Sequence, residues 1–169
     1  MSFRGELRAA AWATEAHGLA LGLGLLLLYP APAEAQDTTL AGVVTSYLEC
    51  IECMNGELQA VTLRGGAAVS LLTRRLRGGP PLPALQSRRQ SLFALQARAP
   101  RPGHPDSLAA PFRRSLDNYV AQYRTRAAHA LRVLGPMVAR DSLCAVSWVE
   151  FRSDVQVAVR TAQAAVGCP

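Results

Sequence analysis

The sequence predicts an all-α protein of about six or seven helices. Apolar residues recur at steps of three and four along most of the chain, and glycine and proline separate these stretches. No segment shows the strict alternation of apolar and polar residues that predicts a β-strand. Apolar residues make up 50% of the chain and aromatic residues only 6%, which favours packing of small-residue helices over an aromatic-rich β-sandwich.

The first 35 residues have the order of a secretory signal peptide. Two arginines precede an apolar run over residues 18–29, and a small-x-small triplet follows at 33–35. We expect cleavage after Ala35, so that Gln36 begins a single helical domain over 36–169. The apolar run has 12 residues, fewer than the roughly 20 that cross a bilayer as a helix. An uncleaved membrane anchor is the alternative, and no later stretch is long enough to span a membrane.

The first helix of this domain is predicted over Thr38–Ile51, where the apolar residues form one stripe. Asp37 or Thr38 can cap its start, because both side chains can accept a hydrogen bond from a free backbone N–H. We expect Asn55–Gly56 to end this helix.

A helical hairpin is predicted next. Its two helices are Glu57–Arg64 and Ala67–Arg77, and Gly65–Gly66 separates them. Gly78–Pro81 follows as a strong stop, since glycine can adopt a left-handed conformation and proline cannot continue a helix.

The middle of the chain is less regular. Ala84–Arg98 is a weaker helix candidate, because the spacing of its apolar residues is imperfect. A proline-rich loop is predicted near residues 99–106. A short helix over Ser107–Leu116 follows, with Pro111 in or near its first turn.

The clearest helix is predicted over Asp117–Leu134, where a continuous apolar stripe runs along one face. Gly135–Pro136 ends it and begins the next helix, which carries Val138, Leu143, Val146 and Val149. The last helix begins at Ser153–Gln156, which has the pattern of a capping box, and ends at Gly167.

The cysteines are Cys50, Cys53, Cys144 and Cys168, and an even number in an exported chain indicates two disulfides. Three pairings are open. On a helical turn, residues i and i+3 lie about 5 Å apart, within the range of a disulfide. We therefore favour a local bond between Cys50 and Cys53, which leaves Cys144 to pair with Cys168. Bonds from Cys50 and Cys53 to the two distant cysteines remain the alternative.

A redox function for Cys50 and Cys53 is a second hypothesis, since thioredoxin-like proteins use a C-x-x-C pair. In that motif the pair opens a helix after a strand, whereas here it is predicted to close a helix. The spacing to Cys144 and Cys168 does not match a zinc knuckle, so we expect no metal site.

Two segments resemble one another: 58–72 and 123–139. Each is a small-residue helix that reaches a glycine, turns, and continues as a second amphipathic helix. Over about half of residues 36–169 the chain resembles the HEAT repeat of bacterial proteins, and residues 153–162 resemble the first helix of a further repeat. The resemblance implies a short stack of antiparallel helix pairs. It also implies a function in protein–protein contact or scaffolding.

The chain lacks the motifs of common enzyme classes, including H-E-x-x-H, G-x-S-x-G, G-x-G-x-x-G and the P-loop. His104 and His129 are expected at the surface, and no serine has an identifiable base. Glu49, Glu52 and Glu57 are expected to be solvated. We therefore predict a non-catalytic protein without a cofactor.

All 18 basic residues are arginine, a bias typical of a GC-rich, bacterial genome. Selection of arginine for bidentate contacts with anions is the alternative explanation. Residues 36–169 hold 16 arginines and 9 acidic residues, a net charge of +7. Arginines cluster in the middle of the sequence and are candidate contacts for an anionic partner: Arg74, Arg75, Arg77, Arg88 and Arg89. Export argues against nucleic acid.

The sequence therefore predicts an exported, periplasmic or extracellular helical protein that binds a protein partner in the cell envelope. A thiol–disulfide protein and a binder of an anionic surface are the alternatives.

Overall fold

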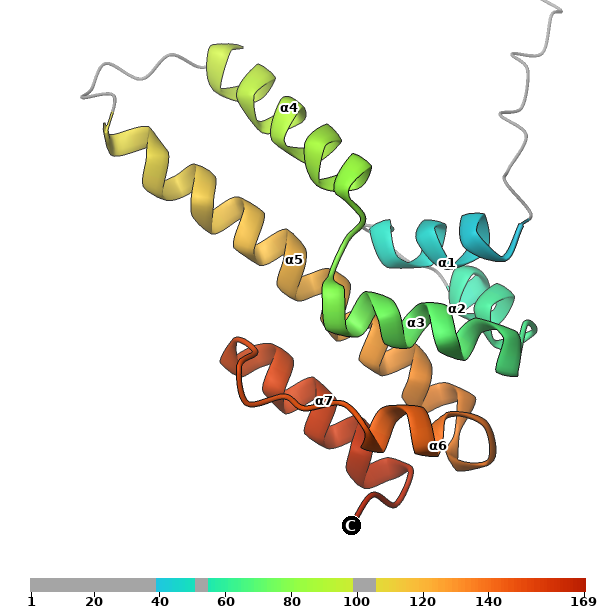
Figure 1. Cartoon of the computed structure of the whole chain (residues 1–169). Coiled ribbons are helices and arrows are strands. Elements are labelled where there is room, and N and C mark those ends of the chain that lie inside the picture. Colours follow the sequence, from blue (N-terminus) through green and yellow to red (C-terminus); the bar gives the residue numbers. More distant parts are fainter. Residues whose placement is uncertain (1–38, 51–54, 99–105) are drawn as a thin grey trace, which may run out of the picture. The chain divides into compact units, whose positions relative to one another are not determined.

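The computed structural model describes residues 39–50, 55–98 and 106–169 (Figure 1). Asp37–Pro169 is one compact unit. Its described helices, in chain order, are α1 (Leu40–Glu49), α2 (Asn55–Thr62), α3 (Gly66–Gly78), α4 (Leu82–Arg98), α5 (Asp106–Leu134), α6 (Pro136–Cys144) and α7 (Ser153–Ala165). No strand occurs within the described ranges, and the predicted all-α fold is confirmed. None of these helices is long and apolar enough to cross a bilayer.

The long helix α5 lies at the centre of the unit and packs mainly against α3 and α7 (Figure 1). The inner face of α5 carries small side chains: Ala127, Ala128 and Ala130 have no exposed surface. Small side chains let neighbouring helices approach closely, and larger residues from those helices fill the remaining space. Leu72 of α3 and Val159 of α7 are fully buried in this core.

The start of the unit differs from the prediction in two details. Thr39 caps α1, with its Oγ1 accepting a hydrogen bond from the Gly42 N–H at 3.1 Å. Asp37 and Thr38, the predicted caps, lie outside the described residues, as does Ile51. Asn55–Gly56 does not end a helix but forms the first turn of α2. A helix start tolerates these residues because its first N–H groups lack helical partners in any case.

The two helices of the predicted hairpin are present as α2 and α3, but they do not pack against each other as a hairpin. Helix α2 packs against α1 and α5, and α3 packs mainly against α5 and α6. Val61 of α2 and Leu76 of α3 are fully buried, as the apolar stripes require. Gly79 ends α3 with φ of +76°, a conformation that suits glycine. A Cβ at this position would lie 3.4 Å from the Val120 Cγ1 of α5, so the chain turns in close contact with the central helix.

The predicted break between Ser107–Leu116 and Asp117–Leu134 is wrong, because both segments belong to the continuous helix α5. Asp117 is a good capping residue, yet no glycine or proline stands between Phe112 and Leu134, so nothing forces the helix to end. Pro111 lies within the second turn of α5. The helix continues through it, although proline removes one backbone hydrogen bond.

The last two helices follow the predicted order with altered ends. Gly135 has φ of +82° and Pro136 occupies the first turn of α6, as expected. The helix ends at Cys144, so Val146 and Val149 lie beyond it. Val146 is still buried, whereas Val149 is 70% exposed.

Helix α7 begins at Ser153 as predicted, but the capping box does not form. Arg152 occupies the N-cap position and makes no side-chain capping bond. The Asp154 carboxylate instead accepts a hydrogen bond from the Val155 N–H at 2.9 Å. An acidic group in the first turn is favourable there because of the helix dipole.

A disulfide joins Cys144 to Cys168, with the two Cα atoms 5.4 Å apart. The Gln163 side chain supports the same connection, since its Nε2 donates to the carbonyl oxygens of Leu143 and Val146, each at 3.0 Å. The C-terminal residues are thereby fixed to the end of α6. Cys50 follows α1 directly, whereas Cys53 lies outside the described residues. The predicted local bond therefore stays a prediction.

Candidate functional site

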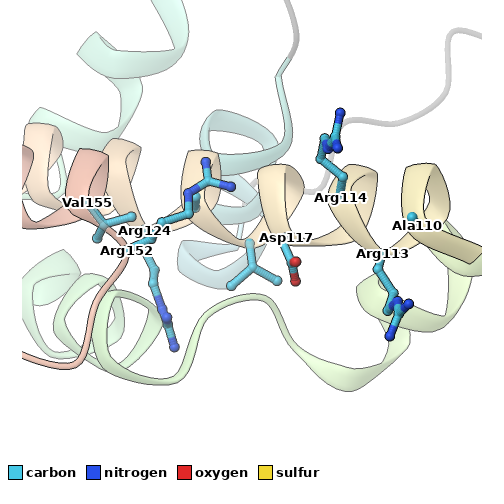
Figure 2. Close-up of a pocket in the computed structure, with 9 residues that line it drawn as sticks. Ala110, Arg113, Arg114, Asp117, Arg124, Arg152 and Val155 are labelled. Atoms are coloured by element: carbon cyan, nitrogen blue, oxygen red, sulfur yellow. The ribbon is translucent and has the colours of Figure 1, made fainter.

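A pocket of about 520 Å³ lies beside α5 and carries four arginines (Figure 2). Arg113, Arg114 and Arg124 come from α5, and Arg152 comes from the N-cap of α7. Asp117 is the one carboxylate in the lining, and the apolar wall consists of Ala110, Val120, Ala121 and Val155. We call this site the arginine pocket. Arg113, Asp117, Val120 and Arg124 share one side of the helix, because they follow one another at steps of three or four residues.

Arg152 is held in a fixed position at the edge of the arginine pocket. Its Nε and Nη2 donate to the two carboxylate oxygens of Asp154 at 2.9 and 2.6 Å, and its Nη1 donates to the Asn118 Oδ1 at 2.7 Å. The hydrogen bond with Asp154 raises the pKa of Arg152 and lowers the pKa of Asp154. The Asn118 contact also ties the α7 N-terminus to α5.

Arg124 is the most enclosed arginine of the pocket. Its Nη2 donates to the Arg77 carbonyl oxygen at 3.1 Å, and its guanidinium carbon lies 4.9 Å from the centre of the Phe151 ring. Its Nε is buried and has no hydrogen-bond partner within the described part of the chain. Burial lowers the pKa of Arg124. This side chain therefore carries a poorly solvated positive charge, which an anion would stabilise.

Arg113 and Arg114 are exposed and leave α5 in opposite directions (Figure 2). Asp154 balances the charge of Arg152, which leaves Asp117 as the one carboxylate of a lining that also holds Arg113, Arg114 and Arg124. The pocket is therefore electropositive. Guanidinium groups bind carboxylates through two parallel hydrogen bonds, and the arrangement suits an acidic ligand.

Helix α4 lies against the first half of α5 and extends the basic surface. None of its residues is buried. Phe93 stacks on Phe112 of α5 with ring centres 4.6 Å apart, and Arg88 lies 5.7 Å from the centre of the Tyr119 ring. Large apolar side chains of α4 remain more than half exposed: Leu82, Phe93 and Leu95.

The arginines predicted from the sequence are spread over several surfaces. Arg74 and Arg77 line a different pocket of about 780 Å³, between α3 and α6. The Arg77 Nη2 donates to the Ala145 carbonyl oxygen at 3.0 Å and so covers the end of α6. Arg75 is partly buried and acts electrostatically on Tyr123, whereas Arg89 is exposed on α4.

Other predicted positions take no part in the arginine pocket. Cys144 and Cys168 form the disulfide at the opposite end of α7. Ala35, Gln36 and His104 lie outside the described residues. Glu49 accepts a hydrogen bond from the Tyr119 hydroxyl at 3.4 Å. The described residues include no cluster of three or more metal-ligating side chains.

The sequence contained one signal for the arginine pocket that our prediction did not use. Arg113, Asp117 and Arg124 fall on one side of a helix only if α5 is continuous. The predicted break after Leu116 placed Arg113 on a different helix from Asp117 and Arg124, so their common side was not recognised. The participation of Arg152 could not be read from the sequence, since 28 positions separate it from Arg124.

Comparison with family models, with curated proteins and with solved structures finds no match for this chain. Its function is therefore argued from its own geometry.

Proposed function

We propose that this protein is an exported, non-catalytic helical module that binds an acidic segment of a partner protein in the arginine pocket. The observation that carries the proposal is the gathering of four arginines from two helices around a pocket with one carboxylate in its lining. Electropositive pockets attract acidic partners and raise their association rates. The partner belongs to the cell envelope if the first 35 residues act as a signal peptide.

The exposed apolar residues of α4 support a protein partner over a small ion. Leu82, Phe93 and Leu95 are 64%, 59% and 59% exposed, beside the same half of α5 that supplies Arg113 and Arg114. Protein interfaces combine apolar and aromatic contacts with surrounding arginines. An acidic segment with apolar residues would fit both surfaces.

A HEAT-like arrangement is part of the proposal. Two pairs of successive helices, α2 with α3 and α5 with α6, are each joined at a glycine with positive φ, Gly65 and Gly135, and α5 also packs against α6. The second helices of these pairs, α3 and α6, pack together. Stacked helix pairs of this kind present extended faces to partners.

The pocket can be tested with a fluorescent peptide that contains glutamate and leucine residues, followed by fluorescence anisotropy. We expect saturable binding that weakens with added salt, because part of the attraction is electrostatic. Arg113→Gln should weaken binding about tenfold, the loss of one charge-assisted hydrogen-bonded contact. Arg140→Gln is the matched control, since Arg140 is exposed on α6 and lies outside the pocket lining.

Equal affinity in the Arg113→Gln and Arg140→Gln variants would remove the arginine pocket from the proposal. Phe93→Ala tests the apolar surface of α4 separately from the arginine pocket. It should lower the affinity for the same peptide, although the charge of the protein is unchanged.

Export and the cysteine state can be tested together. Mass spectrometry of protein from an exporting host, alkylated without reduction, reports the N-terminal residue and the state of Cys50 and Cys53. We expect a start at Gln36 and no alkylated cysteine. An alkylated Cys50–Cys53 pair would instead favour the thiol–disulfide function.

A further inference from the structure

A third and smaller pocket, of about 290 Å³, is lined by residues of α1, α5 and α7. Its polar lining comes from three helices: Tyr47 of α1; Thr125, Arg126, His129 and Arg132 of α5; and Thr161 of α7. We call it the His129 pocket. It shares no lining residue with the arginine pocket, so a substitution in one lining leaves the residues of the other unchanged.

Hydrogen bonds determine which groups of this pocket donate. Arg132 Nη2 lies 3.3 Å from the Nδ1 of His129. Because a guanidinium only donates, Nδ1 accepts, and the proton of the neutral imidazole is on Nε2. Arg126 Nη1 donates to the Leu48 carbonyl oxygen at 3.1 Å, which fixes the position of this guanidinium. The pocket therefore holds two guanidinium groups and an imidazole N–H.

Acceptors with a negative charge are missing from this lining. Tyr47 of α1 and Thr161 of α7 contribute hydroxyl groups to the lining, and the Tyr47 hydroxyl donates to the Arg126 carbonyl oxygen at 3.5 Å. The charged groups of the lining besides His129 are Arg126 and Arg132, which come from α5 and are both positive. No carboxylate lines the His129 pocket. The two positive charges therefore lack a partner of opposite charge within the lining.

The protonation of His129 agrees with this picture. Burial and the nearby charge of Arg132 lower its pKa below the ordinary value of 6.5. The ring stays neutral at pH 7 while the pocket is empty, because protonation would add a third positive charge. An anion in the pocket would oppose both effects and raise the pKa.

We propose that the His129 pocket binds a phosphate group, either as free inorganic phosphate or as the phosphate of a larger molecule. Two guanidinium groups offer N–H donors, and the imidazole N–H and the hydroxyl groups of Thr125 and Thr161 offer more, which together match the several oxygens of a phosphate. The volume is at the lower end of the range for small-molecule sites, so it suits a single small group. This site goes beyond the proposed function, which concerns the arginine pocket.

The experiment is a titration of the protein with inorganic phosphate, monitored by the imidazole resonances in NMR spectra. A His129→Gln variant identifies the His129 resonances. We expect these resonances to shift to saturation and the pKa of His129 to rise. Arg132→Gln should weaken phosphate binding at least tenfold, and because Arg132 is exposed, this variant should fold normally.

Two controls test whether the effect belongs to this pocket. Arg140→Gln and Arg98→Gln each remove one positive charge from an exposed position outside the linings of the described pockets and should bind phosphate as the unaltered protein does. A His129 response that does not saturate, or an equal loss in all three variants, overturns the proposal, since either result means an adventitious ion only.

A second arm distinguishes the source of the phosphate group. Flotation with vesicles of phosphatidylcholine containing phosphatidic acid tests a lipid headgroup. Phosphate binding without vesicle binding supports a free ion or a soluble phosphate compound, whereas vesicle binding that Arg132→Gln abolishes supports a headgroup. Absence of saturable binding in both arms overturns the proposal.

Discussion

At the scale of single residues, the core depends on close contact between aliphatic side chains and the alanines of α5. Leu72 and Leu131 have no exposed surface, and Ala127, Ala128 and Ala130 pack around them in the same cluster. A truncated leucine would leave a cavity, because helices in such close contact cannot move inward to fill it.

Leu72→Ala should therefore lower the free energy of unfolding by about 2–5 kcal/mol. Leu63→Ala provides the matched control, since Leu63 is 80% exposed and its truncation should change stability by less than about 0.5 kcal/mol. Urea denaturation monitored by circular dichroism measures both values. Similar losses in the two variants would contradict the described core.

His129 gives the fold a specific pH dependence. Its pKa is lowered by burial and by Arg132, so as the pH falls through about 6.5 the unfolded chain takes up a proton before the folded chain does. The unfolded state binds more protons in that range, and the free energy of unfolding therefore decreases as the pH falls. The contribution of His129 to stability is fully present above the pKa of the unfolded chain, and it is completely lost below the lowered pKa of the folded chain.

His129→Gln should remove this part of the pH dependence. Urea denaturation of both proteins between about pH 5 and pH 7.5, in buffer free of phosphate, measures the difference, and contributions of other titrating groups cancel in it. Identical pH profiles for the two proteins would show that His129 is not protected from protonation in the folded state.

At the scale of helices, α4 and α5 differ most. Helix α5 is buried along its second half, whereas α4 has no buried residue and contacts α5 through side chains such as Phe93 and Arg88. Local stability follows the number of buried apolar contacts. The α4 helix can thus open without unfolding of the core.

We expect the amide hydrogens of α4 to exchange with solvent much faster than those over residues 119–134 of α5. Hydrogen exchange followed by mass spectrometry measures this difference. Binding of the acidic peptide should slow the exchange in α4, because the partner would cover Phe93 and Leu95. Protection of α4 equal to that of α5 in the free protein would argue against a separately opening helix.

The predictions of the helices succeeded where local signals are strong. Glycine turns at Gly65, Gly79 and Gly135 were read correctly, because positive φ is a local requirement of the backbone. The break predicted before Asp117 failed, since a capping residue permits a helix start without requiring one. The prediction that Asn55–Gly56 ends a helix failed for the same reason, because residues common at helix ends also occur in the first turn of a helix.

At the scale of the whole molecule, the disulfide between Cys144 and Cys168 closes a segment with a sequence separation of 24. It joins α6 to the residues after α7, and the Gln163 hydrogen bonds act at the same place. A crosslink of this length restricts the unfolded chain and leaves the folded chain almost unchanged.

Replacing both cysteines, Cys144→Ser with Cys168→Ser, should lower the free energy of unfolding by about 3 kcal/mol. The fold should persist, because Val155, Val159 and Ala162 still bury α7 against the core. Met137→Ser is the control on α6, as Met137 is 95% exposed. Unchanged stability in the double variant would show that the hydrogen bonds of Gln163 suffice.

The amino-acid sequence by itself determined that the chain is helical, where most helices begin and end, and which aliphatic faces are buried. These properties follow from helical periodicity and from backbone preferences of glycine and proline, which act over a few residues. The packing of the helices selected the pairing of Cys144 with Cys168 among the alternatives left open. It also placed Arg152 in one pocket lining with Arg113 and Arg124, and Tyr47 and Thr161 in another with His129. Such groupings depend on how helices distant in sequence pack, and no local preference specifies that packing.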